Sequence, residues 1–319
     1  VWDSGGAQSL TRLTQRGTIA IEEFLQSDGE RSVSLGGCGR APPSPLAVAE
    51  VPEEVAEMIE KSRLELSGYL EGKLDEFGAW DNLTQIKEEF RGQTKFGISG
   101  KFLTVSAEEL SAYLDLSAKR VQSAIDKAFD KKTGLYHGYF VNIPAEYETI
   151  TRKDTKVLPG QGKVLPCIKV KRFNSRPLPL FLEAQVHALR LIKDRSAAKE
   201  LHRNLMKSAL VDRKLNMFLV SASVKKEPYE IGRITTFSPG WLENQSVWLH
   251  MEYKYMLELL KAGLYDDFYK KMKDVLIPFL KPEVYGRSIF ENCSFIASSL
   301  HPNNKVHGNG FYARLSGST

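Results

Sequence analysis

The second half of the chain contains the clearest helical pattern. Val247, Met251, Tyr255 and Leu259 recur every four residues, which places them on one face of a helix. The segment Lys261-Ala262-Gly263-Leu264 follows, with a cation near the helix end, a glycine suited to a left-handed cap and an apolar residue after it. Apolar residues at helical spacing resume directly after this segment. The pattern therefore predicts an αα-hairpin with a short connection.

Helical patterns also cover much of the rest of the chain. Ser106-Ala107-Glu108-Glu109 has the form of a capping box before an apolar run that ends near Leu116. Pro52 lies where the first turn of a helix tolerates a proline. We interpret Trp80-Asp81-Asn82 as another helix start, with Asp81 or Asn82 as the cap. The other predicted helices are 46–74, 118–129, 182–192 and 197–210.

Strand-like segments are few. Residues 167–173 alternate weakly between apolar and polar, and 231–237 is predicted to be extended. We interpret 28–45, rich in Gly, Pro and Ser, as a linker-like insertion, and 151–166 as a loop. No βα alternation is sustained. Helical hairpins joined by long polar loops predict a mainly α fold with minor β structure, of the toroid or solenoid kind.

Composition sets broad limits on the class of protein. The 319 residues include 44 Lys and Arg against 39 Asp and Glu, a net charge of +5, and 42% are hydrophobic, which excludes wholesale disorder. Because acidic residues are interleaved with basic ones, a nucleic-acid partner is not favoured. No stretch approaches the roughly 18 apolar residues of a membrane span. Three widely spaced cysteines fit a reducing, cytoplasmic compartment.

The last forty residues differ in character from the helices. Small residues, hydroxyl groups, His and Arg are dense there, as in His307-Gly308 and Ser316-Gly317. Glycine beside Ser or Thr lets backbone N–H groups and hydroxyls converge on an anion, and a nearby His or Arg adds charge-assisted hydrogen bonds. Composition alone still favours a polar loop over an anion site.

A second group of polar and aromatic residues precedes the predicted αα-hairpin. Sugar sites combine aromatic faces, which cover the C–H side of a pyranose, with carboxylates and amides that bond its hydroxyls. Trp241, Glu243 and Asn244 suit that role. The alternative for Ser238-Pro239 is a helix N-cap and first-turn pair. We interpret Asp212-Arg213 as an ion pair or cap and not as a catalytic group.

Longer motifs carry a family resemblance. They are 1–10, 176–183, 230–242, 248–264, 284–299 and 307–319. These segments resemble the cellobiose-phosphorylase clan of inverting glycoside phosphorylases, and within it they are most like the β-1,3-glucan phosphorylases. The resemblance covers most of the chain.

The resemblance implies an (α/α)6 toroid that catalyses phosphorolysis of β-glucan oligosaccharides with inversion, releasing α-glucose 1-phosphate. Inorganic phosphate is then a co-substrate, and neither a cofactor nor a metal is expected. The His-Gly and Ser-Gly elements that hold phosphate in this clan correspond to His307, Gly308, Ser316 and Gly317. The expected sugar-side residues are Arg233, Trp241, Glu243 and Glu291. A phosphorylase uses an anionic nucleophile in place of water, so it needs one carboxylic acid and an anion cradle.

The sequence also departs from the clan. Its Asp-Trp-Asn/Asp-Asp acid motif is absent, the chain opens at Val1 without Met, and it ends inside the phosphate motif. We therefore expect residues 1–319 to form part of one toroid catalytic domain in a larger polypeptide, with the general acid outside this chain and a second copy as a possible partner. The alternatives are a non-catalytic structural or carbohydrate-binding subunit derived from such an enzyme, and a helical glycoside hydrolase.

Overall fold

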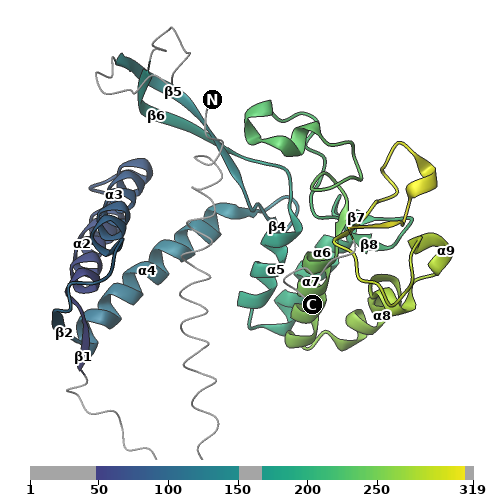
Figure 1. Ribbon diagram of the computed structural model, residues 1–319, viewed down its shortest axis with the longest axis horizontal. Coiled ribbons are helices and arrows are strands. Elements are labelled where there is room, and N and C mark those ends of the chain that lie inside the picture. The colour runs from purple at the N-terminus through teal and green to yellow at the C-terminus, as the bar shows by residue number, and fades with distance from the viewer. Residues whose placement is uncertain (1–47, 151–166, 313–319) are drawn as a thin grey trace, which may run out of the picture. The chain divides into compact units, whose positions relative to one another are not determined.

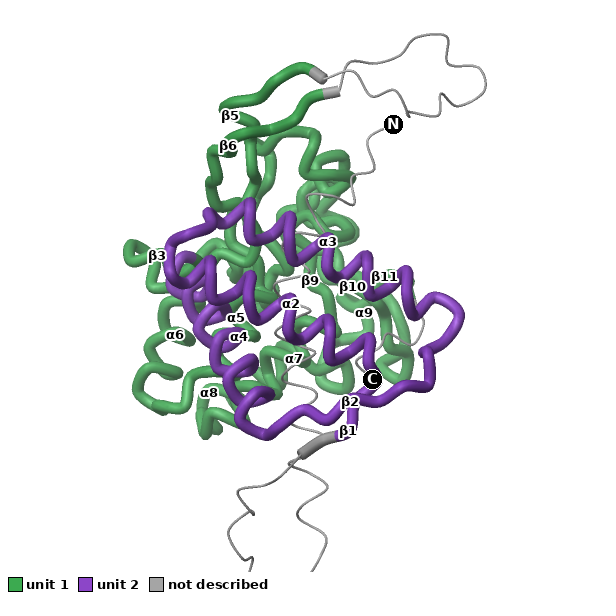
Figure 2. Tube along the Cα trace, turned by 90° about the vertical axis from the view of Figure 1, so that its left-hand side faces the viewer, with its two compact units in different colours: residues 1–13, 128–319 green, residues 14–127 purple. Residues whose placement is uncertain are grey.

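The computed structural model describes residues 48–150 and 167–312, in which eight α-helices are combined with small antiparallel sheets (Figure 1). These residues form a mixed α/β structure with two compact units, coloured separately in Figure 2. The described part of unit 2 is 48–127, and that of unit 1 is 128–150 and 167–312. The expected insertion at 28–45 and loop at 151–166 lie outside the described residues. A single (α/α)6 toroid over 1–319 stays a prediction.

The described part of unit 2 contains a helix pair, a third helix and a two-stranded sheet. Helices α2 (Glu53–Leu70) and α3 (Glu76–Thr94) lie side by side (Figures 1 and 2), and Asn82 Nδ2 of α3 donates to Glu65 Oε2 of α2 at 2.8 Å. Strands β1 (Val48–Pro52) and β2 (Phe102–Ser106) pair antiparallel. The third helix, α4 (Ala107–Ala128), follows β2 directly.

The capping box predicted at the start of α4 is confirmed. Ser106 N donates to Glu109 Oε2 at 2.8 Å, and Glu109 N donates to Ser106 Oγ at 3.2 Å. The apolar run expected to end near Leu116 and the helix predicted at 118–129 form one continuous helix, because α4 extends to Ala128. No Gly or Pro interrupts the helix at that point, and Ser117 Oγ is satisfied by donating to Tyr113 O at 2.9 Å.

The helix start predicted at Trp80-Asp81-Asn82 is also wrong. These residues lie inside α3, whose N-cap is Asp75. The Asp75 side chain accepts a hydrogen bond from Gly78 N at 2.7 Å. Both positions offer an acidic residue of the capping type, so residue identity alone did not distinguish the cap from an Asp within the helix.

Unit 1 contains the helices predicted in the second half of the chain. The segments predicted at 182–192 and 197–210 form α5 (Leu182–Leu191) and α6 (Arg195–Lys207). They are followed by α7 (Leu249–Lys261), α8 (Tyr265–Val275) and the short α9 (Pro282–Tyr285). The largest fully buried side chains of the main core cluster are Leu135, Leu182, Leu189, Leu205, Leu210, Phe218, Tyr255 and Met256.

The predicted αα-hairpin is confirmed in α7 and α8. Leu264 N donates to Leu259 O at 2.9 Å, and Gly263 N donates to Leu260 O at 3.0 Å. This is the Schellman pattern of a helix C-terminus, and Gly263 supplies the left-handed residue at φ 72°. Val247 lies just outside the helix, in strand β9 (Val247–Trp248).

The strands of unit 1 form antiparallel pairs. Strand β6 (Cys167–Pro177) confirms the strand predicted at 167–173, and its partner β5 (Phe140–Ile150) was not predicted. The extended segment expected at 231–237 is wrong, since 3-10 turns occupy Tyr229–Ile231 and Arg233–Thr236. The other paired strands are β3 (Phe129–Asp130) with β4 (Leu135–Tyr136), β7 (Val211–Asp212) with β8 (Met217–Phe218), and β10 (Phe295–Ile296) between β9 and β11 (Gly310–Phe311). None of the described helices has the length and apolar character needed to span a bilayer.

Two leucines on α7 test the contribution of the unit 1 core. Leu259 is fully buried, whereas Leu257 is 46% exposed. We expect Leu259→Ala to lower the free energy of unfolding by about 2–5 kcal/mol, because it removes buried methyl groups and leaves a cavity. The matched variant Leu257→Ala is expected to change it by less than about 1 kcal/mol. Chemical denaturation of both variants measures the difference, and equal losses would contradict the assigned helix face.

Candidate functional site

A tight turn in unit 1 presents Trp241 and Asn244 together. Trp241 N donates to Asn244 O at 3.2 Å, and Asn244 N donates to Trp241 O at 3.1 Å, so the two residues form an antiparallel bridge. Directly paired residues of such a bridge project their side chains to the same side. Leu242, at φ 47°, lies in the turn between them. The helix start considered for Ser238-Pro239 is absent, since no helix of the described residues begins there.

Glu243, in the same turn, is paired with Arg233. Arg233 Nη2 donates to Glu243 Oε1, and its guanidinium lies 5.9 Å from the ring centre of Phe237. Arg233 is exposed, so this ion pair contributes little to stability. Glu243 Oε2 and Asn244 Oδ1 are both buried, and neither has a hydrogen-bond partner among the described residues. Two adjacent side chains thus keep free acceptor capacity.

Trp241 is surrounded by aromatic rings of a neighbouring segment. Its ring centre lies 5.1 Å from that of Phe295, 4.5 Å from that of Phe311 and 5.6 Å from that of His301. The two Phe contacts are edge-to-face, which is a favourable geometry for aromatic pairs. At Gly240 an added Cβ would lie 2.6 Å from His301 N, so only glycine permits this approach of the two segments.

The phosphate-side candidates His307 and Gly308 follow His301 in the chain. His307 Nε2 lies 2.8 Å from His301 O, and because a carbonyl only accepts, Nε2 carries the proton. No hydrogen bond of His307 Nδ1 to a described residue is present. Gly308 N donates to Ala297 O at 2.8 Å, and its φ of 84° requires glycine. The Gly308 N–H is therefore already used within the fold.

The structure brings most, but not all, of the predicted site residues together. Arg233, Trp241 and Glu243 lie in one loop, and His301 connects that loop to His307. Glu291 is exposed and lies 3.5 Å from Arg287 Nη1, and no contact among the described residues joins it to the other candidates. Ser316 and Gly317 lie outside the described residues.

The side chain of Asp212 is buried and fully hydrogen-bonded. Its Oδ1 accepts from Lys214 N at 2.9 Å, Leu215 N at 3.1 Å and Ser299 Oγ at 2.7 Å, and its Oδ2 accepts from Ser299 N at 2.6 Å. The bonds from Lys214 N and Leu215 N close the turn between β7 and β8, and no helix of the described residues begins there for Asp212 to cap. The other two bonds fix Ser299, two residues before His301, so Asp212 positions the site loop without belonging to the site.

Sequence reasoning missed two buried titratable side chains in unit 1, Glu252 and Lys271. Glu252 of α7 is fully buried and accepts hydrogen bonds from Phe218 N with both carboxyl oxygens, at 3.0 and 3.1 Å. Burial raises the pKa of Glu252 to about 8. Burial also lowers the pKa of Lys271, whose Nζ donates to Asn216 O at 2.7 Å. The signal in the sequence is the spacing of Glu252 relative to buried Leu249 and Met256, which places all three on one helix face.

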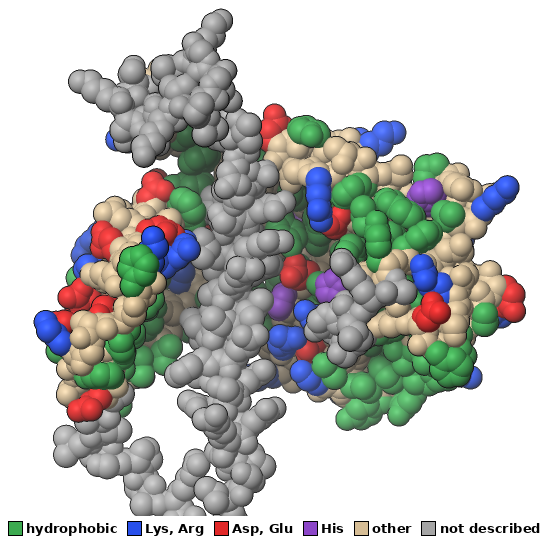
Figure 3. Space-filling model, in the orientation of Figure 1, with side chains coloured by type: hydrophobic (Ala, Val, Ile, Leu, Met, Phe, Trp, Pro, Cys, Tyr) green, Lys and Arg blue, Asp and Glu red, His purple; other side chains and the backbone are tan. Residues whose placement is uncertain are grey.

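The surface of unit 1 shown in Figure 3 carries hydrophobic side chains with Lys, Arg, Asp, Glu and His side chains among them.

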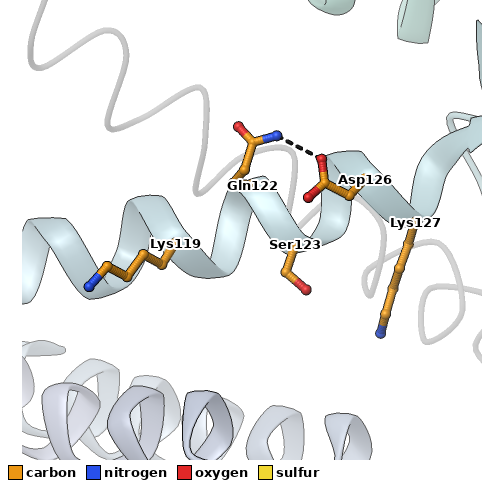
Figure 4. A pocket seen from close by; sticks show the side chains of 5 residues that line it. All are labelled: Lys119, Gln122, Ser123, Asp126 and Lys127. Carbon is orange, nitrogen blue, oxygen red and sulfur yellow. Dashed lines mark hydrogen bonds between the residues drawn. The ribbon is translucent and has the colours of Figure 1, made fainter.

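A hollow with a volume of about 510 Å³ borders α4 in unit 2 (Figure 4). Gln122 Nε2 donates to Asp126 Oδ1 there, at 2.8 Å. Its described lining residues are Lys119, Gln122, Ser123, Asp126 and Lys127. All five come from a single helix and contain no pair of converging reactive groups.

Within 48–150 and 167–312, no group of three or more His, Cys, Asp or Glu side chains is arranged to hold a metal ion.

A comparison with protein-family models found no match to this chain, and a comparison with curated proteins found none either.

The buried carboxyl of Glu252 predicts a pH dependence of stability. The folded protein keeps the Glu252 proton up to about pH 8, whereas the unfolded chain releases it above its usual pKa of 4.5. Unfolding therefore releases a proton in this window, and rising pH favours unfolding, by at most about 1.4 kcal/mol per pH unit. Glu252→Gln retains an acceptor for Phe218 N and removes the titration. We expect the wild-type protein to lose stability relative to this variant between pH 5 and 8 in denaturation experiments; parallel curves would contradict the assignment.

Proposed function

We propose that this chain takes part in phosphorolysis of β-glucan oligosaccharides, β-1,3-linked, with inversion and release of α-glucose 1-phosphate. One observation carries the proposal: the sugar-side and phosphate-side candidates, about sixty residues apart in the sequence, meet at His301. The Trp241 and His301 ring centres lie 5.6 Å apart, and His307 Nε2 lies 2.8 Å from His301 O. A reaction between a sugar and phosphate needs such a junction.

The loop of Trp241 and Glu243 has the chemistry of a sugar site. Trp241 is half-buried, and an indole face of this kind covers the C–H side of a pyranose. Glu243 Oε2 has free capacity to accept a sugar hydroxyl, while Arg233 neutralises the carboxylate through Oε1. In this proposal Arg233, Trp241 and Glu243 bind the glucan. Glu291 is proposed as a further sugar-binding residue on the resemblance alone.

His307 supplies the proposed phosphate contact. With Nε2–H directed at His301 O, protonation of Nδ1 makes it a charge-assisted donor to a phosphate oxygen. The positive charge offsets repulsion around the anionic nucleophile and orients its attacking oxygen. Gly308 serves in this proposal by allowing the chain to turn at φ 84°, and Ser316 and Gly317 complete the anion cradle. The general acid is proposed to come from the rest of a larger polypeptide.

The proposed enzyme is an (α/α)6 toroid of the cellobiose-phosphorylase clan, located in the cytoplasm. The succession of α5, α6, α7 and α8, with the short α7–α8 connection, supports a fold built from helical hairpins. The rest of the toroid proposal depends on the resemblance of the sequence motifs to that clan. Phosphate and a β-glucan are its substrates.

The reaction is tested by incubating the polypeptide that contains this chain with laminari-oligosaccharides and inorganic phosphate. We expect phosphate-dependent release of α-glucose 1-phosphate, measured with phosphoglucomutase-coupled detection. The control omits phosphate and should release neither glucose 1-phosphate nor glucose. Absence of glucose 1-phosphate with every β-glucan tried would rule out the enzyme. Glucan binding without turnover would instead support the non-catalytic carbohydrate-binding alternative.

His307 is tested by two variants, each of which keeps a polar group near the position of one of the two imidazole nitrogens. His307→Gln preserves a donor near the Nε2 position and so retains the bond to His301 O, but it lacks Nδ1. We expect it to fold with an unchanged Tm and to raise the phosphate KM by about tenfold or more, since a charge-assisted bond is lost. His307→Asn loses the bond to His301 O and should lower Tm.

The matched control for His307 is His137, whose Nδ1 lies 2.8 Å from the backbone oxygen of Leu178. His137→Asn is expected to leave the phosphate KM unchanged. An equal rise of the phosphate KM in His137→Asn and His307→Gln would show that the effect is structural.

A further inference from the structure

The amide of Asn244 is half-satisfied inside the site loop. Asn244 is 6% exposed, and its Nδ2 donates to Phe237 O at 2.7 Å. Its Oδ1 is buried and has no hydrogen-bond partner among the described residues. Buried side-chain oxygens are nearly always paired, because an unpaired one loses its water without compensation. The oxygen therefore points to a donor that the described residues do not supply.

The position of this oxygen restricts what the donor is. The Trp241–Asn244 bridge puts the amide on the same side as the half-buried indole. Glu243 Oε2, on the adjacent residue, is a second buried acceptor without a partner. A half-buried indole in the same turn as two open acceptors matches a molecule with C–H faces and several hydroxyl donors. An ammonium ligand is disfavoured, because Arg233 already neutralises Glu243.

We propose that Asn244 Oδ1 determines specificity by accepting a hydrogen bond from one hydroxyl of a glucosyl residue whose C–H face packs against Trp241. This inference rests on the proposed function for the identity of the sugar, and it adds a residue that the resemblance does not supply. Asn244 binds the glucosyl residue in this proposal and does not touch the phosphate. It is a binding residue, so its removal weakens sugar binding whether or not the bond is cleaved.

The test combines a protein variant with changes in the sugar. Laminaribiose and its monodeoxy analogues are titrated by calorimetry, without phosphate, into the wild-type polypeptide and into Asn244→Leu. We expect one analogue to bind the wild type about tenfold more weakly than laminaribiose, since it lacks the hydroxyl that Asn244 accepts. In Asn244→Leu that difference disappears, because the acceptor has been removed. If Asn244→Leu does not fold, Asn244→Ser serves as the second variant.

Ser221 provides the matched control. Ser221 Oγ donates to Glu243 O at 3.1 Å and accepts from Gln245 N at 3.1 Å, so it supports the same turn without touching the Asn244 amide oxygen. Ser221→Ala is expected to keep the wild-type pattern of analogue affinities, even if all of them weaken together. A selective loss for the same analogue in Ser221→Ala would assign the effect to the turn and overturn the proposal.

The remaining outcomes separate this inference from the proposed reaction. Equal affinity ratios in the wild type and Asn244→Leu, or no binding of laminaribiose, overturn the role of Asn244. If glucose 1-phosphate is released but the analogue affinity ratios are the same in the wild type and Asn244→Leu, the proposed reaction is supported and only the role of Asn244 is excluded. If the analogue affinities depend on Asn244 but no glucose 1-phosphate is released, the sugar site is supported and the proposed reaction is excluded.

Discussion

One buried carboxylate holds the candidate site in place. Asp212 lies in strand β7 and accepts four hydrogen bonds, two from its own hairpin and two from Ser299. These bonds stabilise the Asp212 carboxylate, which would be costly to bury without hydrogen-bond donors. Since Ser299 is fixed in this way, His301 is held against Gly240 and Trp241, where no space remains for a side chain on residue 240. The contact between the two site loops therefore depends on a residue outside the site.

Helices in both units were predictable where their signals are local. A repeat of four residues, a cap and a glycine at the C-terminus sufficed for the α7–α8 hairpin, and the box at Ser106 sufficed for the start of α4. Errors arose where local preference left two possibilities. Asp75 and Asp81 are both plausible caps, and 231–237 is rich in β-branched residues but forms 3-10 turns between loop segments. Strand β5 was missed because a two-stranded ribbon depends on its partner across the chain.

The candidate site was only partly accessible from sequence. Trp241, Glu243 and His307 could be singled out as residue types with the right chemistry. Their convergence depends on long-range contacts, namely the aromatic cluster around Phe295 and the Asp212–Ser299 bonds, and no local pattern encodes these. The same limit applies to Glu252, whose burial follows from the packing of α7 against strand β8. A carboxylic acid on an apolar helix face is visible in sequence, but its shifted pKa is not.

Within the described part of unit 1, hydrogen-bond satisfaction separates the structural polar groups from the functional candidates. Asp212 and the Gly308 N–H have all their partners within the fold, so neither has capacity for a ligand. Glu243 Oε2 and Asn244 Oδ1 lack partners among the described residues, and His307 Nε2 is used while no described group bonds Nδ1. Buried atoms without a hydrogen-bond partner also occur in unit 2, at Glu54 Oε2, Trp80 Nε1 and Arg120 Nη1, whereas in the described part of unit 1 they are confined to Glu243 and Asn244. Leaving these two acceptors open, in the turn that carries a half-buried indole, retains the free-energy cost of their lost hydration. Ligand binding is a physical reason for keeping them, and this is why the proposed sugar side of the site is the Trp241–Asn244 turn.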